Sequence, residues 1–265
     1  KIQDVPLAQI GGKGLFIKEI EEALLTGQVD LAVHSLKDMP AEMPEGLMLG
    51  PVPPREECRD AFISSRYANL AEIPPGGRVG TGSLRRRVQV LHRWPDLEVV
   101  PLRGNVDTRL KKMETLRLDG LILAAAGLNR LGLAHVYRGC LPASDMLPAV
   151  GQGALGLEVR VADHALRALL AFLDDPPTRG AVTAERAFLA RLEGGCVVPV
   201  AALGRVEGGT LHLEALISDL EGRRVLRDQR SGPMAEAAEL GTQVAESLLA
   251  QGGREILAAL YGRPL

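Results

Sequence analysis

The sequence predicts an α/β fold built from several compact units, and three observations lead to this prediction. Helix and strand patterns alternate through the first two-thirds of the 265 residues, which is typical of a parallel or mixed sheet. Joints rich in proline and glycine interrupt the alternation at 50–54, 147–151 and 174–177 and indicate linkers. The residues after these joints predict an α+β unit with an antiparallel sheet. A chain of this length suits two or three such units.

Hydrophobic spacing and helix-ending residues define the individual elements. Apolar residues in 16–26 recur on one helical face, and Gly27 follows where helices often end. Short apolar runs predict buried strands at 29–33, 78–80, 97–102 and 121–125, and helical patterns follow two of them at 84–93 and 106–116. The α+β unit is expected to contain a helix ending at Leu192, strands near 197–206, 210–218 and 223–229, and a closing helix from about 235.

Bulk composition narrows the classes of function. Aromatic residues make up only 3% of the chain, which argues against stacking platforms for single-stranded nucleic acid. A net charge of -2 argues against a general polyanion binder. No apolar run reaches the length needed to cross a membrane. The five histidines show no metal-ligand spacing, so no metal site is expected.

The three cysteines, Cys58, Cys140 and Cys196, are an odd number without a CxxC pair. A disulfide framework or a structural zinc site is therefore not expected, and the pattern fits a reducing, cytoplasmic location. Cys58 and Cys140 are interpreted as small buried apolar residues. Cys196 follows two glycines after the long helix, and these leave room around its sulfur. Because the chain starts at Lys1 rather than at a methionine, the question whether a leader sequence precedes it stays open.

Positive charge is concentrated between residues 78 and 112. Nine arginines and lysines in this stretch face only three acidic residues, although the whole chain is close to neutral. A local excess of this kind favours a specific anionic ligand over nonspecific binding. Most of these cations lie in or beside two turns.

The first basic turn lies in segment 79–87, where a stretch rich in hydroxyl groups and glycine joins a strand to a helix. Free backbone N–H groups at a helix start, together with the helix dipole, form an anion site. Arg85 and Arg86 add forked donors that match carboxylates. The alternative is that Thr81 or Ser83 is an ordinary N-cap while the arginines lie in water. This segment alone leaves both interpretations open and leans toward the N-cap.

The second basic turn, in segment 100–109, repeats this layout with Arg103 and Arg109 beside a small polar turn. Turns at the carboxyl ends of strands lie at the ligand-binding edge of an α/β sheet. Two basic turns at one edge are harder to explain as solvated surface than one. Their ligand is expected to be an organic acid with several carboxylates, or a phosphate.

A third candidate is segment 33–40, where Lys37 and Asp38 follow an apolar strand. A fixed carboxylate at this ligand-facing position can stabilise a cationic intermediate. A strand-end ion pair or a turn aspartate explains the same residues equally well, so both interpretations stay open.

Two motif matches are rejected as nucleotide sites. Residues 151–156 fit GxGxxG, but a strand pattern follows at 157–161, where a dinucleotide fingerprint needs a helix. Residues 11–14 place a lysine among glycines but lack the spacing and the hydroxyl of a phosphate-binding loop. This second segment is interpreted as a mobile loop.

Taken in order, these segments resemble the porphobilinogen deaminase (hydroxymethylbilane synthase) family. The matching stretches, in family order across nearly the whole chain, are 11–16, 34–40, 80–86, 102–109, 126–132, 148–154 and 192–199. The resemblance implies three domains: two α/β domains, similar to those of periplasmic binding proteins, around an active-site cleft, and a small α+β domain that carries a cofactor cysteine. The implied boundaries are 1–53 with 154–172, 59–147, and 176–265.

The resemblance also implies the reaction and its cofactor. Four porphobilinogen units are deaminated and joined head to tail on a dipyrromethane primer, held by a thioether to Cys196, and linear hydroxymethylbilane is released for haem biosynthesis. Asp38 matches the catalytic carboxylate, which stabilises the electron-poor azafulvene left when ammonia departs. The residues that match cofactor-binding groups are Lys37, Ser83, Arg85 and Arg86, and those that match substrate-binding groups are Ser35, Arg103, Arg109 and Arg130.

The implied ligand suits the basic turns, because every added ring brings two carboxylates. Each hydrogen bond to a charged group contributes about 1.5–3 kcal/mol, and burying an unpaired carboxylate costs several kcal/mol of free energy.

This sequence departs from the family in two places. Gly82 replaces a serine that is common in the first turn. The family also has a further strand, helix and strand ahead of the position that matches Lys1, so this part of the first domain is expected to be missing.

Two other functions stay open at this point. A noncatalytic two-domain receptor for an organic anion would explain the cleft and the arginines, but not a third domain with a Gly-Gly-Cys segment. A nucleic-acid binder would explain the basic stretch, but not the low aromatic content. On the family's pattern we expect porphobilinogen as the small-molecule partner, no nucleic-acid or membrane partner, and a cytoplasmic monomer.

Overall fold

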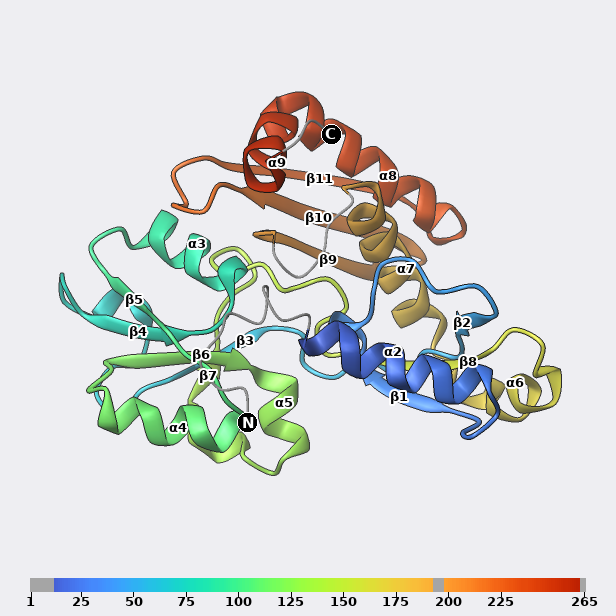
Figure 1. Ribbon diagram of the computed structural model, residues 1–265. Helices are drawn as coiled ribbons and strands as arrows, with labels where there is room; N and C mark the ends of the chain where they lie inside the picture. Colours follow the sequence, from blue (N-terminus) through green and yellow to red (C-terminus); the bar gives the residue numbers. More distant parts are fainter. Residues whose placement is uncertain (1–11, 193–197, 263–265) are drawn as a thin grey trace.

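The computed structural model describes residues 12–192 and 198–262. Three β-sheets with their helices lie side by side, and we call them the first, second and third unit in the order in which the chain enters them (Figure 1). No helix within these described ranges is long and apolar enough to cross a membrane.

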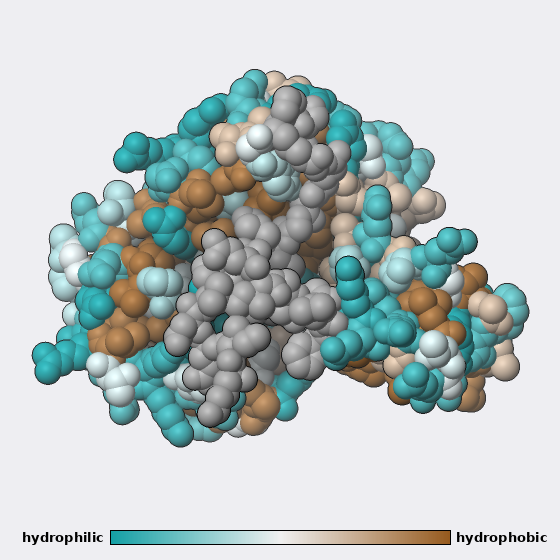
Figure 2. Space-filling model, viewed as in Figure 1, coloured by the Kyte–Doolittle hydropathy of each residue, from teal (hydrophilic) through white to brown (hydrophobic). Residues whose placement is uncertain are grey.

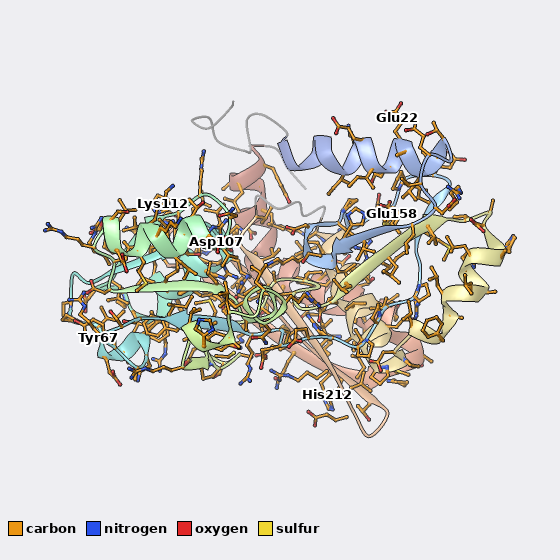
Figure 3. All side chains as sticks on the ribbon, turned by 90° about the horizontal axis from the view of Figure 1, so that it is seen from below. Glu22, Tyr67, Asp107, Lys112, Glu158 and His212 are labelled. Carbon is orange, nitrogen blue, oxygen red and sulfur yellow. The ribbon has the colours of Figure 1, made fainter. Side chains whose placement is uncertain are left out.

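The first unit contains an antiparallel sheet and two helices: strand order β1 (Ala32–Ser35), β8 (Leu155–Arg160) and β2 (Leu47–Leu49), with α2 (Gly12–Leu25) and α6 (His164–Leu170). Leu24 of α2 packs with Ala32 and Leu47 in a small core. Figure 3 shows Glu158, on the central strand, on the side of the sheet that α2 covers. Because β8 arrives from far along the chain, two distant segments build this sheet.

The second unit contains a five-stranded mixed sheet in the order β5-β4-β6-β3-β7. Its elements are β3 (Asp60–Ile63), β4 (Arg78–Thr81), α3 (Leu84–Arg93), β5 (Glu98–Pro101), α4 (Val106–Thr115), β6 (Gly120–Ala124), α5 (Ala125–Arg130) and β7 (Gly139–Cys140). Strand β4 runs parallel to β5, and Thr81 is the register partner of Pro101. The two basic turns that follow these strands therefore lie at one edge of the sheet, as the sequence predicts.

The third unit contains an antiparallel sheet in the order β11-β10-β9 with three helices. Its elements are α7 (Pro176–Arg191), β9 (Val200–Glu207), β10 (Thr210–Ser218), β11 (Val225–Pro233), α8 (Ala237–Leu248) and α9 (Arg254–Tyr261). One face of β10 alternates into the core, where Leu211 and Leu213 pack with Phe188 of α7 and Val244 of α8. Figure 2 shows hydrophilic residues mixed with apolar ones on the visible face of this unit. The mixed α/β fold class with a C-terminal antiparallel sheet is confirmed.

Short helical turns complete the fold. They are η1 (Leu36–Asp38), η2 (Leu70–Glu72), η3 (Ala134–Val136), η4 (Ala171–Leu173), η5 (Met234–Glu236) and the π-helical η6 (Leu249–Gly253). The closing helix that the sequence predicts is broken in two at η6, because Gly252 adopts a φ of 109°, a left-handed value that interrupts a regular helix.

The expected strand at 29–33 is wrong in position, since β1 begins only at Ala32. The backbone amides of Gln28 and Val29 donate to the carbonyl of Ala23, at 2.9 and 3.2 Å, and so close the last turn of α2. Val29 fits a strand pattern because it is apolar, but its amide donates to the last turn of α2, so it belongs to the helix end. Strands β2, β3 and β7 escape the sequence patterns because they are only three, four and two residues long.

Candidate functional site

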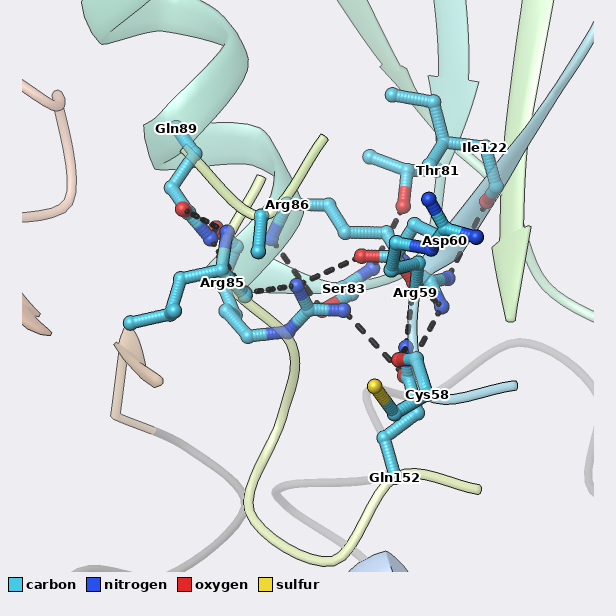
Figure 4. Close-up of polar contacts among 12 residues, drawn as sticks. Cys58, Arg59, Asp60, Thr81, Ser83, Arg85, Arg86, Gln89, Ile122 and Gln152 are labelled. Atoms are coloured by element: carbon cyan, nitrogen blue, oxygen red, sulfur yellow. Dashed lines mark hydrogen bonds and ion pairs between the residues drawn. The ribbon is translucent and has the colours of Figure 1, made fainter. Parts of the chain in front are cut away.

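A buried carboxylate, Asp60 at the start of β3, organises the cations of the first basic turn. Its Oδ2 accepts a hydrogen bond from Arg85 Nη1 at 2.8 Å, and its Oδ1 accepts from Arg86 Nη2 at 2.8 Å and Nε at 3.0 Å (Figure 4). Gln152 Nε2 donates to the same Oδ1 at 2.8 Å. Burial works to raise the pKa of Asp60, but the charges of Arg85 and Arg86 and their hydrogen bonds hold it well below its usual range. We call these four residues the Asp60 cluster.

The start of α3 explains why two adjacent arginines point into the molecule. Ser83 Oγ accepts from the amide of Arg86 at 3.4 Å, so Ser83 is the N-cap. The interpretation of this segment as an ordinary N-cap is therefore confirmed for Ser83. The accompanying expectation that the arginines lie in water is wrong. Arg85 and Arg86 do not lie in water, because each is only 5% exposed. The carboxylate of Asp60 compensates much of the cost of burying them.

The Asp60 cluster carries more positive than negative charge, since one carboxylate faces two guanidinium groups. Arg85 Nη1 also donates to the carbonyl of Leu147 at 2.6 Å, and Arg86 Nη1 to that of Ile122 at 3.2 Å. Arg85 Nε is buried with no hydrogen-bond partner within the described residues. A buried cation excess with one unused donor is suited to an anionic ligand.

Two further cations lie in the electrostatic field of Arg86. Burial and then the Arg86 charge lower the pKa of Lys37 to about 8, although Asp38 and Asp60 work to raise it. Burial and the Arg86 charge also lower the pKa of Arg109. The structure therefore gathers Lys37 of the first unit and Arg109 of the second basic turn around the Asp60 cluster.

The loop that carries Asp38 is fixed against the linker between the units. Asp38 ends η1, which follows directly on Ser35, the last residue of β1, and its side chain is partly buried. The amide of Leu36 donates to the carbonyl of Ala154 at 3.0 Å. Lys37 in this loop lies near Arg85 and Arg86, and that Lys37 and Asp38 face a ligand stays a prediction.

The remaining predicted arginines lie further out. Arg103 is exposed in the second basic turn, and its carbonyl accepts from Lys112 Nζ at 3.2 Å. Arg130 is exposed at the end of α5 and donates from Nη2 to the carbonyl of Gly153 at 2.8 Å. Arg109 is partly buried and donates from Nε to the carbonyl of Gly104 at 2.8 Å.

Cys196 lies outside the described residues. Leu192 and Val198, on either side of this segment, belong to the core of the third unit. Cys58 and Cys140 are free and pack against apolar clusters, as small apolar residues do, but they are only partly buried rather than buried. No group of histidine, cysteine, aspartate and glutamate side chains in the described ranges could hold a metal ion.

The close approach of the two basic turns depends on Gly82. A Cβ atom at this position would lie 2.3 Å from the carbonyl oxygen of Leu102 and 3.8 Å from Arg109 Nη2. The amide of Leu102 donates to the carbonyl of Thr81 at 3.1 Å and so extends the β4–β5 pairing into the turns. A side chain at this position, such as the serine common in the family, would require the Leu102 carbonyl to shift, so glycine allows the two turns to lie this close.

Sequence reasoning missed four residues that hold the site together: the buried Asp60, Gln152 and Glu185, and the partly buried Arg55. Glu185 of α7 pairs with Arg55, which directly follows the joint at 50–54, from Nη1 to Oε1 at 2.5 Å and from Nη2 to Oε2 at 3.1 Å. Gln152 lies in the rejected GxGxxG match, and Asp60 begins a strand too short to be recognised. A polar residue next to a short apolar run is the one signal that the sequence offers for Asp60.

Comparison with known proteins places these observations in a family. Residues 1–168 match the model "Porphobilinogen deaminase, dipyromethane cofactor binding domain", and residues 180–250 match "Porphobilinogen deaminase, C-terminal domain". The chain is 52% identical over 265 residues to a porphobilinogen deaminase of Pelobacter propionicus, covering 100% of this chain and 85% of that protein. It is 55% identical to one of Syntrophus aciditrophicus, covering 99% and 86%.

Similarity to solved structures is weaker. A methionine-binding protein is 14% identical and covers 58% of this chain and 74% of its own, with a TM-score of 0.39. A periplasmic binding protein of Salmonella typhimurium with high arginine specificity is 16% identical and covers 60% and 70%, with a TM-score of 0.34.

Proposed function

The chain belongs to the porphobilinogen deaminase family, and on this premise we propose how its own residues carry out the reaction. It is a transferase of tetrapyrrole biosynthesis, a hydroxymethylbilane synthase, which joins four porphobilinogen units head to tail with loss of ammonia. Sequence identity of 52% and 55% to two porphobilinogen deaminases, over 100% and 99% of this chain, favours the enzyme over the alternative of a noncatalytic receptor. The observation that carries the residue assignment is the cation excess of the Asp60 cluster.

The residues of the cluster fit the dipyrromethane group that this family binds. That group bears carboxylate side chains, and the unpartnered Nε of Arg85 and the excess guanidinium charge are suited to them. When bound, it supplies the pyrrole carbon to which porphobilinogen is added. We propose that Lys37, Ser83, Arg85 and Arg86 hold its carboxylates and that Cys196 is its covalent attachment point.

Asp38 is proposed as the catalytic residue. Loss of ammonia leaves positive charge on the substrate, and a fixed carboxylate stabilises that charge more in the transition state than in the ground state. The position of Asp38 at the end of η1, with Leu36 and Met39 buried on either side, limits its movement. Its carboxylate oxygens can also accept a hydrogen bond from the pyrrole N–H and take up a proton from the ring.

The outer residues are proposed to bind the substrate. Ser35 directly precedes the turn that carries Asp38. Arg103, Arg109 and Arg130 belong to the second unit, where Arg130 donates to Gly153 in the segment that also holds Leu36. Their guanidinium groups match the acetate and propionate groups of porphobilinogen, which bring two negative charges per ring. Several arginines at different depths can serve an oligomer whose charge increases with every addition.

We further propose that the chain acts as a monomer in the cytoplasm, without a nucleic-acid or membrane partner. The two free cysteines among the described residues suit a reducing compartment. Arg85 and Arg86 are buried against Asp60, so they do not offer a surface for a phosphate backbone.

Replacing Asp38 tests the proposed function. Asp38→Asn is expected to lower kcat by about a hundredfold or more, because it removes the charge but keeps the shape of the side chain. The covalent adduct on Cys196, measured by intact mass, and the thermal midpoint should stay close to those of the wild type. Asp30→Asn is the matched control, since the Asp30 carboxylate is 77% exposed just before β1. An Asp38→Asn enzyme with the turnover of this control would contradict the assignment.

A further inference from the structure

The linker turn, residues 151–154, contacts the segment that carries Asp38, the Arg130 side chain and the Asp60 cluster, although its sequence pattern assigns it no function. It connects the second unit to β8 of the first. We propose that Gln152 in this turn is a positioning residue, which sets the geometry of the Asp60 cluster according to the position of the linker. This inference rests on the proposed function and extends it to a residue that contacts no reacting atom.

The linker turn first holds the Asp38 loop. Its Ala154 carbonyl accepts the amide of Leu36 at 3.0 Å. Gly151 has a φ of 69°, and a Cβ atom there would lie 3.1 Å from the backbone nitrogen of Lys37. The loop that carries Lys37 and Asp38 is therefore packed directly on the backbone of the turn.

The same turn holds the outer arginine of the second unit. The carbonyl of Gly153 accepts from Arg130 Nη2 at 2.8 Å and from the amide of Glu56 at 3.2 Å. Gly153 has a φ of 89°, and a Cβ atom there would lie 2.5 Å from the carbonyl oxygen of Glu56. Both glycines of the turn are therefore required by its conformation and by its close contacts.

Between these glycines, the Gln152 side chain enters the Asp60 cluster and is only 1% exposed. Its Nε2 donates to Asp60 Oδ1 at 2.8 Å and to the carbonyl of Cys58 at 2.7 Å. Its Oε1 lies 3.5 Å from the Nη2 atoms of both Arg85 and Arg86 (Figure 4). The amide thus contacts the carboxylate through its donor and both cations through its acceptor. Because it carries no charge, it orders the cluster without cancelling the cation excess.

The backbone of the linker turn is tied to the third unit. The amide of Gly151 donates to Glu185 Oε2 at 2.7 Å, and the carbonyl of Gln152 accepts from Arg55 Nε at 2.8 Å. A shift of α7 relative to the second unit therefore carries the turn with it, moves the Gln152 amide along Asp60 and changes how the carboxylate is shared between the two guanidinium groups. Through this residue, the arrangement of the units acts on the orientation of the arginines.

Gln89 of α3 offers a matched control. It is 4% exposed, and it also binds the chain close to this linker, donating to the carbonyl of Leu147 at 3.0 Å and accepting its amide at 2.7 Å. Gln89 does not contact Asp60, but it shares the Leu147 carbonyl with Arg85 Nη1 and also donates to the carbonyl of Arg85 at 3.2 Å. Gln152→Leu and Gln89→Leu thus remove the same amide from similarly buried positions, and only the first removes a direct contact with the Asp60 carboxylate.

The experiment compares Gln152→Leu, Gln152→Glu and Gln89→Leu with the wild type. For each protein the thermal midpoint, KM, kcat and the fraction of chains with the covalent adduct are measured. The two leucine variants should lose similar thermal stability, whereas Gln152→Leu should raise KM by about tenfold and well above the value for Gln89→Leu, because only Gln152 orders the Asp60 carboxylate and both guanidinium groups directly. Gln152→Glu should raise KM further and reduce the adduct fraction, because a second carboxylate neutralises the excess charge.

The outcomes separate the two claims. Equal KM values and adduct fractions in Gln152→Leu and Gln89→Leu, or a Gln152→Glu protein that binds porphobilinogen as the wild type does, would overturn the inference. A wild-type protein without adduct or turnover would instead overturn the proposed function. If Gln152→Leu does not fold, Gln152→Glu decides, since it keeps a polar group of the same length.

Discussion

Two buried arginine clusters in this molecule differ in how completely their charges are matched. Glu185 meets one guanidinium, that of Arg55, and two backbone amides, those of Gly151 and Gly204. The Asp60 carboxylate meets two guanidinium groups, and within the described residues Arg85 Nε stays without a partner. The Glu185 cluster is complete in itself, whereas the Asp60 cluster can accept a further anion.

The difference shows how charge balance distinguishes a structural ion pair from a cluster that binds an anion. Arg55 directly follows the joint at 50–54 and Glu185 lies on α7, so their pair joins this part of the chain to the third unit. Breaking such a pair leaves one buried charge uncompensated, which costs far more than the pair itself contributes. In the Asp60 cluster the uncompensated charge is already present, and it favours the binding of a carboxylate.

The largest expected effect comes from removing one arginine from each cluster. Arg55→Met leaves Glu185 unpaired, so the free energy of unfolding should fall by about 3–5 kcal/mol. Arg85→Met leaves Asp60 paired with Arg86 and removes an excess cation, so the loss should stay below about 2 kcal/mol. Chemical denaturation of both variants checks the comparison. Equal losses of unfolding free energy in the two variants would mean that the Asp60 cluster carries no excess of positive charge and is a structural ion pair like that of Glu185.

A smaller effect is expected at the contact between the basic turns. Gly82→Ala should lower the free energy of unfolding by about 1–3 kcal/mol, because the Leu102 carbonyl must move away from the new methyl group. Movement of this turn also displaces Arg109, so KM for porphobilinogen should rise. Gly127→Ala in α5 is the control: no atom lies within 4 Å of its Cβ position, and the substitution should be neutral or stabilising. A Gly82→Ala protein as stable as this control would show that the turns do not depend on the glycine.

The smallest expected effect concerns the protonation of Lys37, whose pKa burial and the Arg86 charge lower to about 8. Its ammonium is present below that pH and is lost above it. A bound carboxylate favours the charged form, so KM should rise as the pH increases through about 8, by at most tenfold per pH unit. Lys37→Arg keeps the charge and should remove this rise. Identical pH profiles for wild type and Lys37→Arg, measured from about pH 7 to about pH 9, would exclude Lys37 as its source.

The fold and the cationic residues of the site are predictable from the sequence, because they depend on local patterns. Strand, turn and N-cap follow one another in segment 79–87, and Ser83 caps α3 where the pattern indicates. The position of the arginines is not predictable in this way. They could lie in water or inside the protein, and the choice depends on Asp60, which is far away in sequence.

The linker residues show the same limit more strongly. Gln152 lies in a pattern that resembles a nucleotide site but has the wrong context, and its four polar contacts come from segments distant in the chain. Glu185 looks like an ordinary helix residue, although it is fully buried. Long-range pairing of buried charges has no local signature, and a single sequence therefore predicts the ligand-facing turns better than the groups that hold them.

The measurement that tests the cation-excess claim most directly is the intact mass of Arg85→Met, purified in folded form beside the wild type. The wild type should carry the dipyrromethane adduct, whereas Arg85→Met should lack most of it, because the carboxylates have lost the donor that Asp60 leaves unused. An Arg85→Met protein with a full adduct and the KM of the wild type would contradict the account.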